Sequence, residues 1–189
     1  MEPPRLHEAL LEAIDAFTGF CKENNLKYAF MGGLALQAWA RQRATRDVDI
    51  ALSLGNLSEE ELIQKLQHKG FFLETRRSQG DTAWIRFRYN PSKFPLHIEI
   101  DVFPAHGDYQ KEVLNRSVLL EVLGRPWRVV CPEDLILQKL IANRILDQAD
   151  VGNILQEQKD KLDWTYLERW AERLGVSAQL NRFRSAQDS

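Results

Sequence analysis

The sequence predicts a mixed α+β (α/β) fold, in which helices flank a mixed β-sheet and the C-terminal third is helical. Between residues 28 and 130, segments of alternating apolar and polar residues, typical of half-buried strands, are interspersed with helix-like segments. From Pro132 onward the pattern is helical, and this proline stands where the first turn of a helix tolerates it. We therefore expect a core over residues 1–131, a helical region packed on it over residues 132–184, and a disordered polar tail over residues 185–189.

The chain opens with a predicted helix and reaches a pair of glycines through a short strand. Apolar residues recur at helical spacing over residues 6–23, and residues 26–31 have the composition of a short strand. Gly32 and Gly33 follow this strand directly. Residues 34–42 are rich in good helix formers and predict a helix after the glycine turn.

Local signals mark the next two elements clearly. Residues 46–54 alternate as a half-buried strand should. Over residues 57–70, Ser58 and Glu61 have the spacing of a capping box, and Gly70 ends the helical pattern. The sequence therefore predicts a strand followed by a capped helix.

The remaining segments predict an edge strand, two hairpins and the C-terminal helices. Residues 71–77 are expected to form the edge strand, and residues 82–89 and 95–103 flank the turn sequence "NPSK" as the arms of a hairpin. Residues 118–130 predict a second hairpin, which we expect to turn at residues 124–126. The helical patterns of the C-terminal third span residues 132–158 and 163–175.

Composition excludes several classes of protein. The 189 residues suffice for one well-packed domain, and the 44% hydrophobic and 28% charged shares are ordinary for a globular protein. The net charge of -2 argues against bulk electrostatic binding to nucleic acid. No apolar run approaches the roughly 20 residues that span a bilayer, and the N-terminal residues do not form an export signal. Because Cys21 and Cys131 lack metal-type spacing, we expect reduced thiols and a cytoplasmic location, with no membrane partner.

Two carboxylates in the strand over residues 46–54 need a physical explanation. Asp47 and Asp49 are two residues apart, so their side chains leave the same face of the strand and repel each other. Magnesium removes this repulsion, because it binds one or two protein carboxylates and leaves its other positions to water and substrate phosphates. Two such ions, roughly 3.5–4 Å apart, would require a third carboxylate from a neighbouring strand.

The strand over residues 95–103 contains candidates for the third carboxylate. His97, Glu99 and Asp101 alternate with apolar residues and therefore share one face. We expect Asp101 to be the third ligand because it lies between two apolar residues, as Asp49 does. Glu99 could support the site from behind the ligands.

The glycine pair suits the same chemistry. A strand followed by a Gly-Gly turn and a helix N-terminus exposes backbone N–H groups that bind phosphates. Gly32 and Gly33 would then hold a triphosphate beside metal ions on Asp47 and Asp49.

Taken together, these motifs resemble the DNA polymerase β-type nucleotidyltransferase superfamily. That superfamily has a glycine pair, then two aspartates in a strand, then an acid in a later strand. Here the order is Gly32-Gly33, thirteen further residues, Asp47-Val48-Asp49-Ile50 and a later strand acid. The stretch "RATRDVDI" also matches the superfamily's Arg-x-Thr-x-Asp-hydrophobic-Asp form, with Arg43 and Thr45 in place. More narrowly, "CPEDLILQKLIANR" followed by "LDQADVGNIL" resembles the AbiEii-like toxin nucleotidyltransferases and their minimal relatives. The resemblance extends from about Tyr28 to Leu155.

The resemblance implies a nucleotidyltransferase-like fold and a metal-dependent enzyme. Such an enzyme moves a nucleoside monophosphate from an NTP such as ATP to an acceptor hydroxyl on tRNA, a protein or a small molecule, and releases pyrophosphate. The cofactor would be two magnesium ions, or manganese, and an antitoxin-like protein could be a partner. The metal-binding and catalytic positions would be Asp47, Asp49 and Asp101, and the nucleotide-binding positions would be Gly32, Gly33, Arg43, Thr45 and Lys139.

Other interpretations remain open at this point. The two aspartates could cap a turn and pair with Arg46, and Lys139 could be a surface lysine beside an apolar stripe. Arg86 and Arg88 share a strand face with Trp84, which could meet a nucleotide base or RNA or simply be solvated. The alternative function is a non-catalytic nucleotide-binding or toxin–antitoxin partner module on the same fold.

Overall fold

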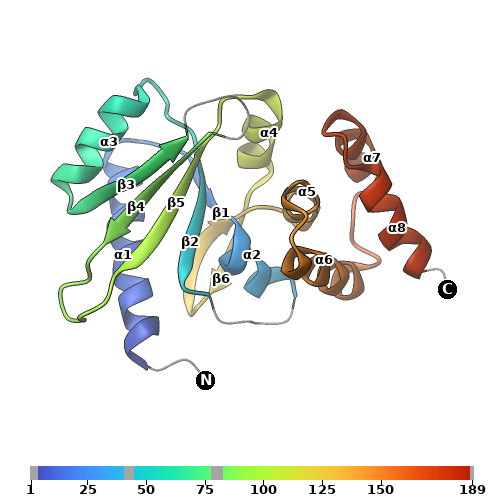
Figure 1. Cartoon of the computed structure of the whole chain (residues 1–189), viewed down its shortest axis with the longest axis horizontal. Helices are drawn as coiled ribbons and strands as arrows, with labels where there is room; N and C mark the ends of the chain where they lie inside the picture. Colours follow the sequence, from blue (N-terminus) through green and yellow to red (C-terminus); the bar gives the residue numbers. More distant parts are fainter. Residues whose placement is uncertain (1–3, 41–44, 78–82, 188–189) are drawn as a thin grey trace.

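The computed structural model describes residues 4–40, 45–77 and 83–187 as one mixed sheet with helices around it (Figure 1). The strands are β1 (Tyr28–Phe30), β2 (Asp47–Leu52), β3 (Phe71–Arg77), β4 (Trp84–Tyr89), β5 (Ile98–Pro104), β6 (Val118–Val122) and β7 (Arg125–Val129). The helices are α1 (Pro4–Glu23), α2 (Gly32–Trp39), α3 (Glu59–His68), α4 (Asp108–Arg116), α5 (Pro132–Ala142), α6 (Ile145–Gln158), α7 (Trp164–Arg173) and α8 (Ser177–Gln187). This architecture confirms the predicted mixed α/β class.

The sheet has seven strands in the order β3-β4-β5-β2-β1-β7-β6. β2 pairs with β5 in parallel, as β1 does with β7, while the other neighbours are antiparallel. Figure 1 shows β3 at one side of the molecule, with α5 to α8 gathered beyond the opposite side of the central strands. The parallel pair β2 and β5 therefore lies near the middle of the sheet.

One face of the sheet packs into the core, and the other carries polar side chains. Val48, Ile50 and Leu52 of β2 are fully buried. The core face is covered in part by α1, whose Phe17 ring lies 5.8 Å from that of Phe71 on β3. Because side chains alternate along a strand, the same pattern turns the aspartates of β2 to the opposite face.

Several local predictions are confirmed. Ser58 and Glu61 form the capping box of α3 with both reciprocal hydrogen bonds present. β4 and β5 form the first predicted hairpin, β6 and β7 form the second, and β3 lies at the edge of the sheet. These elements carry signals within a few residues of each other, which is why sequence patterns find them.

Two predicted turns lie elsewhere. α2 begins at Gly32, so both glycines lie in its first turn rather than in a separate turn before it. The second hairpin turns at Leu123 and Gly124, with φ of 52° and 73°, while Arg125 already belongs to β7. A two-residue turn with both φ positive follows the natural twist of a hairpin, so the turn forms one residue earlier than expected.

The helical part differs from the prediction in three places. α4 was not predicted, because its apolar stripe is short and covers only one side of the helix. Asn143 is left-handed, with φ of 50°, and separates α5 from α6 within the expected 132–158 stretch. α8 continues to Gln187, so it includes part of the tail 185–189 that we expected to be disordered. In the described ranges, no helix combines the length and apolar character needed to cross a membrane.

A buried polar cluster fastens α7 to α5 and α4. Asp134 is fully buried and accepts a hydrogen bond of 2.6 Å from the hydroxyl of Tyr166. Arg116 lies 3.7 Å over the Tyr166 ring, donates to Glu133 at 2.9 Å, and has its Nε 3.5 Å from the other Asp134 oxygen. Burial raises the pKa of Asp134 to about 6. The start of α5 is thus held to α4 and α7 by ionisable groups.

Candidate active site

Four acidic residues lie side by side on two adjacent strands at the polar face of the sheet. In the parallel pairing of β2 with β5, Asp47 stands opposite Glu99 and Asp49 opposite Asp101. Neighbouring strands are about 4.8 Å apart, so each pair brings two carboxylates close together. We call Asp47, Asp49, Glu99 and Asp101 the acid row. Asp47 is exposed and Asp101 is buried, so the acid row leads from solvent into the fold.

The glycine pair fits against the acid row with no room for a side chain. A Cβ on Gly32 would lie 1.9 Å from Oδ2 of Asp49, and its φ is +52°. A Cβ on Gly33 would lie 2.6 Å from Oγ1 of Thr45. The Thr45 hydroxyl in turn donates to the backbone oxygen of Asp47 at 3.0 Å. The structure therefore brings these five predicted residues together at the N-terminus of α2.

The surroundings of Asp49 disfavour the ionised form of its carboxyl group. Burial, together with the nearby carboxylates of Asp101 and Asp47, raises the pKa of Asp49 to about 6, against the opposing charges of Arg144 and Lys139. A divalent cation would relieve this repulsion, and carboxylate oxygens are ligands that magnesium and manganese accept. The donor set of Asp47 and Asp49 therefore fits such an ion.

Asp101 already has a partner. Arg86 of β4 stands opposite Asp101 in the antiparallel pairing of β4 with β5. Its Nε and Nη2 donate to the two Asp101 oxygens, each at 2.7 Å, and its Nη1 lies 2.8 Å from Glu99. Over residues 4–40, 45–77 and 83–187, no group of three or more His, Cys, Asp or Glu side chains has the arrangement of a metal site.

A cavity of about 490 Å³ opens beside Asp49. We call it the Asp49 cavity. Its walls come from two parts of the chain: Gly32 and Asp49 lie on one side, and residues of α4, α5, α6 and α7 lie on the other. Its polar and charged lining consists of Asp49, Tyr109, Gln110, Gln138, Lys139, Arg144, Asp147 and Arg173.

Lys139 lines the Asp49 cavity but is held by carboxylates. Its Nζ lies 3.2 Å from Asp147 and 2.7 Å from Asp150, and the residue is 5% exposed. Arg144, whose side chain is 77% exposed, also pairs with Asp147, at 2.6 Å. Arg144 is thus the more accessible cation at the rim, and the phosphate-binding role of Lys139 stays a prediction.

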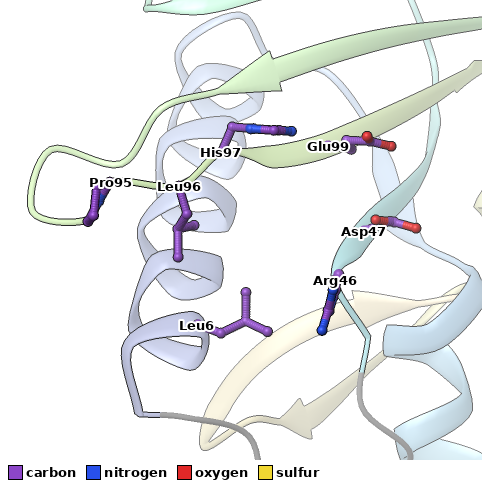
Figure 2. A pocket seen from close by; sticks show the side chains of 7 residues that line it. All are labelled: Leu6, Arg46, Asp47, Pro95, Leu96, His97 and Glu99. Atoms are coloured by element: carbon purple, nitrogen blue, oxygen red, sulfur yellow. The ribbon is translucent and has the colours of Figure 1, made fainter.

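A second cavity, of about 590 Å³, opens beside Asp47 (Figure 2). We call it the Asp47 cavity. Figure 2 shows Leu6 of α1 and Leu96 on one side, and Asp47 and Glu99 on adjacent strands on the other. His97 is exposed immediately before β5 and lies near Glu99. Asp47 and Asp49 therefore each line a different cavity.

Sequence reasoning missed one residue of the site, and another residue that it predicted lies outside the described residues. Arg86 was considered only as part of a strand face, although the predicted hairpin would place it opposite Asp101 once the register is known. Register depends on the hairpin loop, which the pattern alone does not fix. The predicted nucleotide-binding residue Arg43 lies outside the described residues.

Comparison with protein families supports the resemblance. The family described as "Nucleotidyl transferase AbiEii toxin, Type IV TA system" matches residues 16–167, which is well over half of the chain. The match includes the glycine pair, the whole acid row and Lys139. No curated protein matches the chain.

Solved structures show the same fold at low sequence identity. The chain is similar to a nucleotidyltransferase-like antigenic protein from Paracoccidioides brasiliensis, with a TM-score of 0.52, 16% identity, and 91% of this chain and 93% of that one covered. It is similar to ANT(2")-Ia in complex with adenylyl-2"-tobramycin, with a TM-score of 0.54, 18% identity, and 96% and 98% covered. It is also similar to lincomycin-bound LnuA, a lincosamide antibiotic adenylyltransferase, with a TM-score of 0.50, 16% identity, and 75% of this chain and 93% of that one covered.

Proposed function

Because the chain belongs to the AbiEii family of nucleotidyltransferase toxins, we propose that it transfers a nucleoside monophosphate from an NTP to an acceptor hydroxyl and releases pyrophosphate. The observation that carries this proposal is the side-by-side placement of Asp49 and Asp101, directly against the first turn of α2. Asp47, Asp49 and Asp101 would hold the divalent metal ions. When bound, magnesium or manganese neutralises phosphate charge and polarises the acceptor hydroxyl.

The NTP would bind in the Asp49 cavity with its phosphates toward Gly32. The N-terminus of α2 offers backbone N–H groups and the positive end of the helix dipole to an anion. Arg144 and Lys139 place positive charge on the facing wall of the same cavity. These groups would orient the phosphates, and such positioning carries most of the catalysis in phosphoryl-type transfer.

The acceptor would approach from the Asp47 cavity. Its hydroxyl oxygen forms a bond to the α-phosphorus while the bond from that phosphorus to the pyrophosphate oxygen breaks. The hydroxyl proton passes to a carboxylate oxygen of Asp101, which stands beside Asp49 on the neighbouring strand. The mixed lining of the Asp47 cavity, with two carboxylates and two leucines, suits a hydroxyl on tRNA, a protein or a small molecule. Among the structural neighbours, LnuA and ANT(2")-Ia are described with small antibiotics or their adenylyl products.

The decisive experiment compares wild-type protein with Asp49→Asn in a transfer assay. Each labelled NTP is incubated with magnesium and with tRNA, cell lysate or the protein itself, and label transfer and pyrophosphate release are measured. We expect Asp49→Asn to lose at least about 100-fold in rate while keeping the fold by circular dichroism, because it removes a charge at the reacting centre. Asp160→Asn, at an exposed position outside both cavities, is the control and should retain full activity. Full activity in Asp49→Asn would refute the assignment.

A non-catalytic nucleotide-binding module is the second candidate. It is favoured by the two hydrogen bonds from Arg86, which engage both carboxylate oxygens of Asp101. Such a module would bind NTP in calorimetry without releasing pyrophosphate with any acceptor. As a member of a family of type IV toxin–antitoxin proteins, the chain could in either case act with an antitoxin partner.

A further inference from the structure

Arg86 occupies a position from which its side chain neutralises the third carboxylate, that of Asp101. All its guanidinium nitrogens are engaged: Nε and Nη2 donate to Asp101 and Nη1 lies against Glu99. Two parallel N–H···O bonds to one carboxylate form the strongest common arrangement of such a pair. Arg86 therefore engages both oxygens that Asp101 would offer to a metal ion.

Strand register builds this arrangement into the fold. Asp49 on β2, Asp101 on β5 and Arg86 on β4 stand opposite one another in a line across three adjacent strands. Asp101 thus has a carboxylate on one side and a guanidinium on the other. The contact does not depend on a flexible loop, because all three residues lie within strands.

We propose that Arg86 is an internal counter-ion that competes with metal for Asp101 and must move off this carboxylate before the third ligand becomes available. The inference rests on the proposed metal-dependent function. A guanidinium and a divalent cation repel each other, so they cannot share the two Asp101 oxygens at contact distance. Arg86 is accordingly a positioning residue, which keeps the acid row paired until metal and nucleotide arrive.

A second partner for the displaced guanidinium lies on the same strand face. The Arg86 guanidinium carbon is 5.3 Å from the centre of the Trp84 ring, within the range of a cation–π contact. The Arg86 side chain is 32% exposed, so the route away from Asp101 leads toward solvent. Trp84 can therefore retain the charge near the acid row after Asp101 is released.

Metal titration tests the competition without relying on catalysis. Manganese is titrated calorimetrically into wild-type protein, Arg86→Gln and Arg88→Gln, with no nucleotide present. Arg88 is the matched control, because it lies on the same strand face and has the same charge; it stands opposite Glu99, but its ion pair is with Glu74 at 3.7 Å and not with Asp101. We expect Arg86→Gln to bind manganese on the order of tenfold more tightly, the scale of one lost charge-assisted contact, and Arg88→Gln to match wild type within about twofold.

Folding and the proposed function are controlled separately. Circular dichroism checks each variant, and if Arg86→Gln does not fold, Arg86→Lys, which keeps the charge but loses the bidentate geometry, should still bind manganese more tightly than wild type. Equal or weaker binding by the Arg86 variants, with transfer activity intact in wild type, overturns this inference and leaves the proposed function standing. If no protein binds manganese and wild type transfers no nucleotide, both fail.

Discussion

Gly32 lies close against the Asp49 side chain, and adding one methyl group at Gly32 tests this approach. The absence of a Cβ at Gly32 lets the Asp49 carboxylate lie against the backbone at the start of α2, and the positive φ adds a second requirement for glycine. The backbone N–H of Met31 also donates to the backbone carbonyl oxygen of Asp49 at 2.9 Å, so the two segments are fixed to each other. The position of the carboxylate is thus set by the glycine.

We therefore expect Gly32→Ala to displace Asp49. A shift of about 1 Å at a reacting group can cost about 100-fold in rate, and the strained backbone should cost about 1–3 kcal/mol of stability. Gly152→Ala in α6 is the control, since a Cβ there meets nothing within 4 Å and should be neutral or stabilising by up to about 1 kcal/mol. Transfer rates and urea unfolding measure both effects. Wild-type activity in Gly32→Ala would show that the carboxylate is not held by this contact.

At this scale the sequence located the acids but not their counter-ions. Asp47, Asp49 and Asp101 stand out because they interrupt apolar alternation, a pattern that needs no three-dimensional information. The partner of Asp101 depends on the register between β4 and β5, and the ion pairs of Lys139 depend on the turn at Asn143. Neither can be obtained from spacing along the chain.

At the scale of elements, α7 is attached to α5 through groups that titrate. Asp134, Tyr166 and Arg116 form this attachment inside the protein, where an ionised carboxylate loses its hydration. The pKa of Asp134 is about 6 in the folded protein, against about 3.9 for an unfolded chain. The folded state therefore binds more protons between these two values, and stability falls as pH rises from about 4 to about 6.

Asp134→Asn should remove this part of the pH dependence. Wild type is expected to lose on the order of 3 kcal/mol between pH 4 and pH 7 from this group, while the neutral amide can still accept the Tyr166 hydrogen bond. The pKa of Asp49 is also raised to about 6, but that group is present in both proteins and cancels in the comparison. Urea unfolding at several pH values gives the difference. Parallel stability curves for the two proteins would contradict the assignment.

Elements with signals close together in sequence were predictable, and those defined by packing were not. The capped helix α3 and the two hairpins follow from caps, turns and alternation. Helix α4 is only nine residues long, and its Tyr109 and Val113 are buried against the rest of the folded protein. Its existence is therefore a consequence of tertiary structure.

At the scale of the whole molecule, the Asp49 cavity lies between the sheet on one side and the C-terminal helices on the other. Gly32 and Asp49 belong to the first part, and Lys139, Arg144 and Arg173 to the second. A ligand in this cavity would contact both parts at once. Binding should therefore stabilise the molecule as one unit.

NTP with magnesium is accordingly expected to raise the Tm. At 100 times its Kd a ligand adds about 2.7 kcal/mol, and for a chain of this size that corresponds to roughly 5–10 °C. Differential scanning fluorimetry with each of the four NTPs measures the shift and ranks the bases. Asp49→Asn should show a much smaller shift because it weakens metal-dependent binding. A wild-type Tm that no NTP changes would argue against nucleotide binding in the Asp49 cavity.

The separate openings beside Asp47 and Asp49 have a practical consequence for inhibitor chemistry. Two residues along a strand amount to about 7 Å, a span that a short linker covers. A nucleoside polyphosphate analogue tethered to a hydroxyl-bearing fragment would reach both chambers simultaneously. Its two halves would then share a single entropic cost of association, and the conjugate would bind far more tightly than either half alone.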